Sequence, residues 1–473
     1  MRKTKIICTV GPATEEDSVV EQLMLGGMDV VRFNLSHGDY FIHRRRFEQI
    51  ERLRNKLGLP IATMLDTRGP EVRLGSFKGG KSVTVSNGDQ YILTTREVEG
   101  DEHICSVSYK GFADDVKVGT NVLINDGLIA MTVDSISGED IYCRVVDGGI
   151  LSGHKGVNVP GVELSMPYLS EQDMSDLEFG AKMGFDFIAA SFVRSAADVD
   201  YLRKFTNSVG FHSVRIIAKI ENMDGVNNID EIIKSADGIM VARGDMGVEI
   251  PFELIPAIQK TLILKAYKAG KPVITATQML ESMITNPRPT RAEITDVANA
   301  IYDGTSAIML SGETAAGAHP VEALKTMALI AETTEKDINY ADQFKRDLST
   351  TEKRITDAIS HATVTTAHDL NAKAIITVTK SGSTARRISK HRPSCRIISC
   401  TTNEQVCRQM NLSWGVTPLM CEEKNNTDEL FDHAVSVALK NGLVKRSDTV
   451  VLTAGIPLGV SGTTNMLKVD KVK

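Results

Sequence analysis

The first part of the chain alternates short apolar runs with longer segments of helical spacing. Lys5–Val10, Val30–Leu35 and Ile61–Leu65 are apolar and rich in β-branched residues, as strands buried on both faces are. Between them, about Glu15–Leu25 and His43–Leu57, apolar residues recur at helical spacing and glycine follows. Strand and helix alternating in units of about 30 residues predict a parallel α/β architecture.

The pattern changes between Val72 and Pro167. Helical spacing disappears there, and short strands alternate with Gly, Asn and Asp turns. Ser82–Ser86, Tyr91–Thr95 and Asn121–Ile124 are examples. We therefore predict a mostly β domain at residues 71–167, inserted into a loop of the α/β part.

The alternation resumes after the insertion and adds five apolar runs to the first three. Eight βα units predict a closed (β/α)8 TIM barrel built from residues 1–70 and 168–340, with its reactive groups at the carboxyl ends of the strands. A doubly wound open sheet is the alternative layout. The five later runs are Phe187–Phe192, Ile216–Ile220, Gly238–Ala242, Pro272–Thr277 and Ser306–Leu310.

A third segment follows a helix at about Pro320–Asp337. The polar stretch Tyr340–Lys353 predicts a linker, and residues 350–473 predict a C-terminal α/β domain. Its expected helices are near Ile355–Leu370, after Thr384 and near Asp428–Asn441, and its expected strands are Ala374–Thr379, Arg396–Cys400 and Thr449–Thr453.

Composition narrows the functional classes. With 42% hydrophobic and 24% charged residues, the chain has the balance of a globular protein, and a net charge of -6 argues against a nucleic-acid partner. Seven cysteines without a CxxC pair favour reduced thiols in the cytoplasm. We see neither a signal peptide nor an apolar span of about 18 residues, so we expect no membrane partner.

Charged and hydroxyl side chains follow the apolar runs, where barrel strands would emerge on one rim. Lys219, Glu221 and Asp245 would form a cup there, since two carboxylates suit Mg²⁺ and a lysine suits a phosphoryl group. Salt-bridged strand ends are the alternative explanation. Neither a GxxxxGK[ST] loop nor an HRD/DFG pair is present. The other candidates on this rim are Arg32, Asn34, Ser36, Asp66, Thr67, Thr277 and Ser311.

Eight motifs together resemble the pyruvate kinase family, in that family's order and over essentially the whole chain. The resemblance implies transfer of phosphate from phosphoenolpyruvate to ADP, an inserted domain that acts as a lid, a homotetramer, and no further C-terminal domain. The motifs are Arg32–Gly38, Asp66–Glu71, Lys155–Gly161, Ile217–Asn222, Ala242–Glu249, Thr275–Met283, Asn286–Glu293 and Leu310–Thr314.

The resemblance also implies roles for the residues of the cup. Glu221 and Asp245 would hold Mg²⁺ or Mn²⁺, Lys219 would stabilise the phosphoryl group in flight, and Arg32 would be a second phosphate contact. Thr277 and Ser311 would place the water that protonates enolpyruvate, although a threonine at a strand end is often only a turn residue. The substrate carboxylate would meet a helix that opens with Ala242, Arg243, Gly244 and Asp245.

A monovalent cation and a nucleotide complete the implied site. Asn34, Ser36, Asp66 and Thr67 would bind K⁺, although a helix cap and turn would use the same residues. Glu71 suggests K⁺ dependence, because relatives that do not need K⁺ tend to have lysine there. The nucleotide phosphates would meet Arg73, Lys155 and His37. Asp126 would face the same cleft or simply belong to an Asp-Gly turn.

An effector loop is implied in the C-terminal domain. Hydroxyl residues around a glycine between strand and helix can form a phosphate cradle, here for a sugar phosphate, while a plain βα turn is the alternative. Ser461–Asn465 is a weaker candidate for the same pocket. The loop comprises Thr379, Lys380, Ser381, Gly382, Ser383 and Thr384.

Two other functions compete with the kinase. One is a metal-dependent barrel aldolase or lyase, which needs no nucleotide lid, so Arg73 and Lys155 count against it. The other is a catalytically inactive sensor of sugar phosphates, which would be expected to have lost Lys219 or a metal carboxylate.

Overall fold

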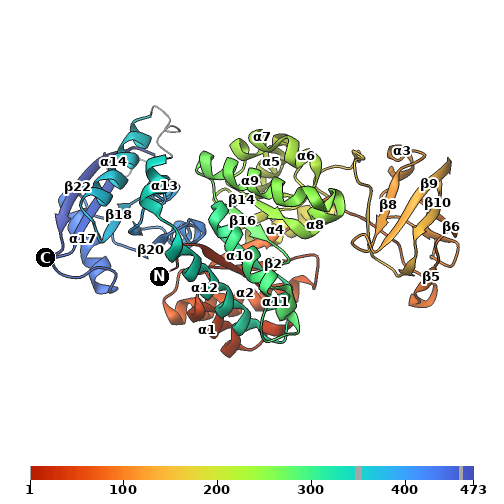
Figure 1. Ribbon diagram of the computed structural model, residues 1–473, viewed down its shortest axis with the longest axis horizontal. Helices are drawn as coiled ribbons and strands as arrows, with labels where there is room; N and C mark the ends of the chain where they lie inside the picture. The colour runs from red at the N-terminus through yellow and green to blue at the C-terminus, as the bar shows by residue number, and fades with distance from the viewer. Residues whose placement is uncertain (1, 347–353, 458–461) are drawn as a thin grey trace.

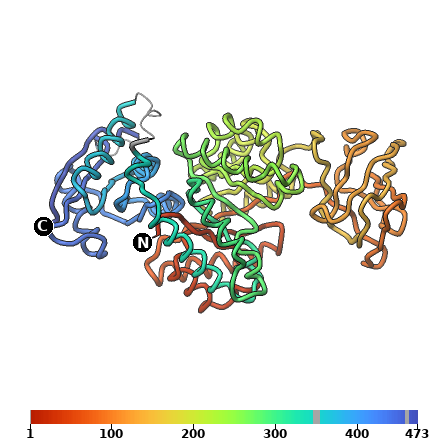
Figure 2. Tube along the Cα trace, viewed as in Figure 1, coloured from red at the N-terminus to blue at the C-terminus, as the bar shows by residue number. Residues whose placement is uncertain are grey.

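The computed structural model, which describes residues 2–346, 354–457 and 462–473, arranges the chain as three bodies in a row. A barrel lies in the middle, the inserted domain lies at one end and the C-terminal domain at the other (Figure 1). The tube view follows the chain out of the barrel into the inserted domain and back again (Figure 2).

The central body is a closed barrel of eight parallel strands, which confirms the (β/α)8 prediction over the open sheet. Around the barrel the strands neighbour one another in the order β1-β17-β16-β15-β14-β13-β3-β2. They are β1 (Lys5–Thr9), β2 (Val30–Asn34), β3 (Ala62–Asp66), β13 (Phe187–Ala190), β14 (Arg215–Ile220), β15 (Gly238–Ala242), β16 (Val273–Ala276) and β17 (Ala307–Leu310).

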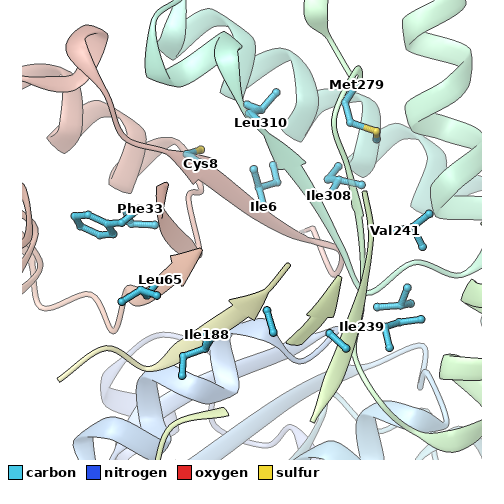
Figure 3. Close-up of a cluster of buried hydrophobic side chains, with 14 of the residues drawn as sticks. Ile6, Cys8, Phe33, Leu65, Ile188, Ile239, Val241, Met279, Ile308 and Leu310 are labelled. Carbon is cyan, nitrogen blue, oxygen red and sulfur yellow. The ribbon is translucent and has the colours of Figure 1, made fainter. Parts of the chain in front are cut away.

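Alternation along each strand explains why the barrel runs are apolar throughout. In β1, Ile7 belongs to the cluster inside the barrel, whereas Ile6 and Cys8 belong to the larger cluster beneath the surrounding helices. Figure 3 labels members of that larger cluster on several barrel strands. Because successive side chains point to opposite faces and both faces are covered, neither face tolerates unpaired charge.

The helices of this body form a layer around the strands (Figure 1). Several begin with a side-chain cap; Ser170, Ser195 and Thr290 each accept the backbone N–H three residues later. The helices are α1 (Asp17–Gly26), α2 (Tyr40–Leu57), α4 (Glu171–Met183), α5 (Ala196–Ser208), α6 (Met223–Asn227), α7 (Ile229–Ser235), α8 (Arg243–Glu249), α9 (Ile255–Ala269), α10 (Arg291–Asp303), α11 (Gly312–Ala315) and α12 (Pro320–Asp337).

The inserted domain is mostly β, as predicted, and has a hydrophobic core of its own. A seven-stranded sheet runs in the order β4-β12-β8-β9-β10-β6-β7, beside the pair β11-β5. One short helix, α3 (Phe112–Asp115), was not predicted. The strands are β4 (Val72–Arg73), β5 (Val83–Val85), β6 (Gln90–Thr94), β7 (Ile104–Ser106), β8 (Asn121–Ile124), β9 (Ile129–Ser137), β10 (Asp140–Asp147), β11 (Gly149–Leu151) and β12 (Gly156–Asn158).

The C-terminal domain is an α/β sheet of five strands in the order β20-β19-β18-β21-β22, in which only the edge strand β22 is antiparallel. The strands β20 and β22 and the helix α16 were not predicted. The elements are α14 (Ile355–Asp369), β18 (Ala374–Val378), α15 (Ser383–Lys390), β19 (Arg396–Thr401), α16 (Glu404–Gln409), β20 (Val416–Met420), α17 (Thr427–Lys440), β21 (Thr449–Gly455) and β22 (Thr464–Lys471).

The predicted linker Tyr340–Lys353 is wrong in its first half, which forms helix α13 (Tyr340–Arg346). Residues 347–353 lie outside the described part of the chain. Two aromatic side chains one helical turn apart explain the helix: Tyr340 packs on Trp414 with ring centroids 5.1 Å apart, and Phe344 stacks on His361 at 4.9 Å. These contacts with the C-terminal domain stabilise a helix that local polarity did not predict.

The C-terminal domain packs against the amino ends of the barrel strands. Arg408 forms a two-pronged ion pair with Asp186, just before β13, at 3.0 Å to each oxygen. Lys5, at the start of β1, donates to the carbonyl of Val416 at 2.7 Å. The carboxyl rim therefore lies at the opposite end of the barrel. No helix within the described ranges is both long and apolar enough to span a bilayer.

Candidate active site

The carboxyl end of β14 places Lys219 at the centre of a buried polar cluster. Its ammonium nitrogen lies 2.9 Å from Glu221 Oε1, 3.2 Å from Asp66 Oδ1 and 2.7 Å from Ser191 Oγ. Burial by itself would lower the pKa of Lys219, but Asp66, Glu221 and Asp245 outweigh it and raise that pKa well above its usual value. Lys219 is therefore a fixed positive charge on the rim.

Asp66, at the end of β3, links Lys219 to Arg32. Arg32 Nε donates to Asp66 Oδ2 at 2.5 Å, and Arg32 Nη1 donates to Thr9 Oγ1 at 3.1 Å. Burial opposes ionisation of Asp66, but Arg32 and Lys219 more than compensate and hold its pKa below the usual value. The structure thus brings together two cations predicted from separate strands.

Ser191 is a member of this cluster that the sequence reasoning missed. Its hydroxyl donates to the carbonyl of Thr67 at 2.7 Å and also contacts Lys219. Ser191 directly follows β13, a strand to which no rim residue had been assigned, because the expected strand extended to Phe192. If the strand had been predicted to end at Ala190, the expectation that functional side chains follow each strand would have identified Ser191.

Glu221 and Asp245 provide two carboxylates suited to a divalent cation. Burial, together with the charge of Asp245, raises the pKa of Glu221 to about 8, even though Lys219 acts in the opposite direction. A bound cation would favour the ionised form of this buried carboxyl group. Within the described ranges no three His, Cys, Asp or Glu residues form a metal-binding group, so such a cation would need further oxygens from substrate or water.

Helix α8 opens at the end of β15 with Arg243, Gly244 and Asp245, as predicted. The backbone N–H of Gly244 donates to Thr277 Oγ1 at 2.7 Å. The guanidinium of Arg243 is buried, donates to the carbonyl of Thr277 at 2.6 Å and pairs with Asp296 at 2.6 Å. The Arg243 side chain is thus held by the protein, which leaves only its backbone for the predicted substrate contact.

Thr277 and Ser311 lie on neighbouring strands. The register of β16 and β17 pairs Thr275 with Ile308, which puts Thr277 level with Leu310, one residue before Ser311. Ser311 Oγ is buried and makes no hydrogen bond to any described residue. A buried hydroxyl without a partner is suited to holding a water molecule.

The four residues predicted to bind a monovalent cation come from two neighbouring strands, and Asn34 pairs with Asp66 in the register of β2 and β3. Asn34 Oδ1 accepts the N–H of Ser36 at 3.0 Å, the local turn that was the alternative reading. Thr67 Oγ1 accepts the N–H of Ser191 at 3.1 Å. Side-chain oxygens of Asn34, Asp66 and Thr67 thus already have protein partners.

A cleft of about 900 Å³ separates the rim from the inserted domain. Glu71 and Arg73, at the first connection, form an ion pair of 2.5 Å. The Lys155 ammonium has no partner among the described residues. Asp126 sits in a left-handed turn, with φ of 57°. The cleft is lined by the predicted residues Asn34, Ser36, His37, Glu71, Arg73, Asp126, Lys155 and Asp245.

A second, smaller cavity of about 90 Å³ lies beside the predicted effector loop. Thr379, Lys380, Ser381 and Thr384 line it, together with Thr464 of β22. Gly382 and Ser383 instead form the turn that opens α15; Gly382 has φ of 75°. Ser461 lies outside the described residues.

Comparison with known proteins agrees with this geometry. The family model "Pyruvate kinase, barrel domain" matches residues 1–324, and "Pyruvate kinase, alpha/beta domain" matches residues 357–470. The chain belongs to the pyruvate kinase family. It is a phosphotransferase, and the family assignment decides against the aldolase alternative.

Individual relatives match over the whole chain. A pyruvate kinase of Clostridium acetobutylicum is 50% identical, with 100% of both chains covered. One of Geobacillus stearothermophilus is 49% identical over 100% of this chain and 80% of the relative. A crystal structure of a pyruvate kinase from Cryptosporidium parvum superposes with a TM-score of 0.93 at 39% identity, covering 100% of this chain and 96% of the other.

Proposed function

We propose that this chain transfers the phosphoryl group of phosphoenolpyruvate to ADP at the rim cluster, with Mg²⁺ or Mn²⁺ held by Glu221 and Asp245. The observation that carries the proposal is the buried ammonium of Lys219, held between Asp66, Ser191 and Glu221 at the end of β14. Phosphoryl transfer needs cations that neutralise the moving group, and the rim provides Lys219 and Arg32 together with two carboxylates, Glu221 and Asp245, for a metal ion.

Lys219 and Arg32 supply fixed positive charge for the moving group. Phosphoryl transfer spreads negative charge over the equatorial oxygens, and preorganised cations in a water-poor site stabilise that charge without reorganising. The divalent cation, when bound, supplies further neutralisation of the same oxygens. Asp66 and Ser191 position Lys219 rather than contact substrate, because their polar atoms face its ammonium.

Proton delivery to the enolate is assigned to Thr277 and Ser311. The unpartnered hydroxyl of Ser311 would hold a water near carbon 3, and Thr277 would orient it from the adjacent strand. The substrate carboxylate would lie at the start of α8, at Ala242–Asp245, where it would compete with Thr277 Oγ1 for the N–H of Gly244.

A monovalent cation is assigned to Asn34, Ser36, Asp66 and Thr67, with K⁺ as the natural ion. Glu71 lines the same cleft, and burial raises the pKa of its carboxyl despite the neighbouring Arg73. A cation close to Glu71 would favour its ionised form. We expect K⁺ dependence because pyruvate kinases that do not need K⁺ tend to have lysine at this position.

The inserted domain is proposed to act as a lid over the nucleotide. Lys155, Arg73 and His37 line the cleft between lid and rim, and Lys155 offers an unpaired ammonium to the phosphates of ADP. Lid closure would exclude water and so protect the phosphoryl donor from hydrolysis.

Regulation and assembly complete the proposal. We assign a sugar phosphate to the cavity at Thr379–Thr384. We also propose that the enzyme is a homotetramer and acts in the cytoplasm. All seven cysteines are free thiols, which suits a reducing compartment. We also propose the division into residues 1–70 with 168–340, residues 71–167 and residues 350–473.

A lactate dehydrogenase-coupled assay tests the proposal. We expect turnover of phosphoenolpyruvate and ADP that requires Mg²⁺ or Mn²⁺, is low in Na⁺ and rises with K⁺ at matched ionic strength. Asp245→Ala should lose the metal-dependent activity, whereas Glu71→Lys should reduce the K⁺ requirement. Equal activity of the wild type with and without K⁺ would remove the monovalent site from the proposal.

A further inference from the structure

One hydrogen bond joins the inserted domain to the barrel across the floor of the cleft. Asn158 Nδ2, at the end of β12, donates to Glu249 Oε1, at the end of α8, at 2.6 Å. Among the described residues the other direct hydrogen bonds between the two bodies lie at the two chain connections: the N–H of Glu71 donates to the carbonyl of Gly69 at the first, and Arg194 donates to Leu164 and Met166 at the second. The Asn158–Glu249 contact is therefore separate from the two chain connections between the barrel and the inserted domain.

The barrel end of this contact lies on the helix that carries a proposed metal ligand. Asp245 and Glu249 are four residues apart in α8, so they lie on the same face, one turn apart. The first residue of α8 is anchored, because the Arg243 guanidinium binds Asp296 and the carbonyl of Thr277. The other end of α8 is held to the inserted domain through Glu249.

The other end of the contact lies on β12, the short strand that directly follows Lys155. Lys155 directly precedes β12, and its carbonyl accepts the N–H of Leu74 at 2.9 Å. Val157 pairs with Val72 of β4 and with Ile124 of β8. A displacement of Asn158 would therefore move Lys155 with the sheet.

The surroundings of Glu249 make it dependent on this donor. Burial raises the pKa of Glu249, and the charges of Asp245 and Asp224 add to the effect, whereas the hydrogen bond from Asn158 opposes it. A carboxylate close to two others gains from an amide donor, and losing that donor would leave like charges facing one another.

We propose that the Asn158–Glu249 hydrogen bond is a latch that couples the orientation of the inserted domain to the position of Asp245. Both are positioning residues: the latch places Lys155 over the nucleotide while it fixes the turn of α8 that presents Asp245 to the metal. The inference rests on the proposed function and adds to it a mechanical link between nucleotide and metal sites.

Steady-state kinetics of Asn158→Ala, Glu249→Ala and the double variant test the latch. We expect each single variant to raise the KM for ADP and the Mg²⁺ concentration for half-activation, by about tenfold for loss of one charge-assisted hydrogen bond. The change in kcat should be small. The double variant should be no worse than the worse single variant, because both remove the same bond.

Two further variants serve as references. Glu249→Gln keeps an accepting oxygen and loses the charge, so it should raise both constants less than Glu249→Ala does. Arg144→Ala removes an exposed ion pair to Asp134 inside the inserted domain and should change neither constant. If Asn158→Ala does not fold, Asn158→Asp, which turns the donor into a carboxylate facing Glu249, provides the same test.

Hydrogen exchange followed by mass spectrometry gives a readout independent of activity. Asn158→Ala, a change in the inserted domain, should speed exchange in α8, and Glu249→Ala should speed exchange around β12. Unchanged exchange across the cleft, or single-variant effects that multiply in the double variant, would overturn the latch. If instead Asp245→Ala retains metal-dependent turnover, the proposed function fails, and the exchange result still decides on the latch.

Discussion

At the scale of single residues, the site is built from charges that could not be buried singly. Lys219 is buried because Asp66 and Glu221 flank it and Ser191 accepts its remaining hydrogen bond. Transferring a charged side chain from water into the protein interior costs several kcal/mol unless partners compensate for the lost hydration. The same partners keep the ammonium charged and in place, so the packing of Lys219 and its proposed chemistry have one cause.

Lys219→Met should abolish turnover and leave binding of phosphoenolpyruvate largely intact. A positioned charge of this kind contributes on the order of 3–4 kcal/mol to transition-state stabilisation. The coupled assay and calorimetric titration of phosphoenolpyruvate measure the two quantities. Lys260→Met, which removes an exposed ammonium of α9 paired with Asp303 of α10, is the matched control. A kcat above about a tenth of wild type would contradict the role, since tenfold corresponds to only about 1.4 kcal/mol.

At the scale of elements, the barrel depends on close approaches between neighbouring strands. β15 carries Asp245 into the cleft through α8, and it begins with Gly238. A Cβ at Gly238 would lie 2.7 Å from the carbonyl oxygen of Pro272 and 2.9 Å from Ile217 Cδ1. Glycine within a strand often marks such an approach. The neighbouring strands β14 and β16 can therefore pack at this spacing only if position 238 has no side chain.

Gly238→Ala should destabilise the barrel by about 1–3 kcal/mol, because overpacking a filled core forces backbone shifts. Differential scanning calorimetry should show a lower midpoint for the transition that includes the barrel. Gly156→Ala is the control, because a Cβ there would lie 3.9 Å from Asn158 Oδ1, which is an ordinary contact distance. Equal midpoints for the two variants would mean that β15 adjusts to a methyl group.

At the scale of the whole molecule, the two cavities lie on different bodies. The C-terminal domain contacts the amino ends of the barrel strands, through Arg408 and Lys5, whereas the proposed catalytic rim lies at their carboxyl ends. An anion beside Ser381 cannot reach the rim. It can alter catalysis only by favouring one arrangement of domains or subunits, which requires two sites and two states.

A sugar phosphate should therefore lower the apparent KM for phosphoenolpyruvate with little change in kcat. If KM equals the dissociation constant of phosphoenolpyruvate, thermodynamic linkage requires phosphoenolpyruvate to tighten effector binding by the same factor. Ser381→Asp would put a carboxylate against the phosphate and should remove activation while sparing basal activity. Ser436→Asp, at an exposed position of α17, is the control. A Ser381→Asp enzyme that responds like wild type would place the effector elsewhere.

The sequence by itself determined the architecture and most of the rim. The eight barrel strands are apolar on both faces, and a charge can enter such a run only where the strand ends. Local pattern therefore located Lys219, Glu221 and Asp66 as well as the strands that carry them. The mostly β insertion was equally visible, because its alternation has a period of two and its turns are rich in glycine.

Tertiary structure alone decided which of these residues meet and what else joins them. Helix α13 forms because Tyr340 and Phe344 find aromatic partners in another domain, so a polar stretch that predicts a linker becomes helical. The contact of Asn158 with Glu249 joins two bodies across a cleft, and its residues are 91 apart in sequence. The periodicity of apolar residues indicates which face of a helix or strand is buried. Contacts between domains depend instead on how the folded domains are placed relative to one another.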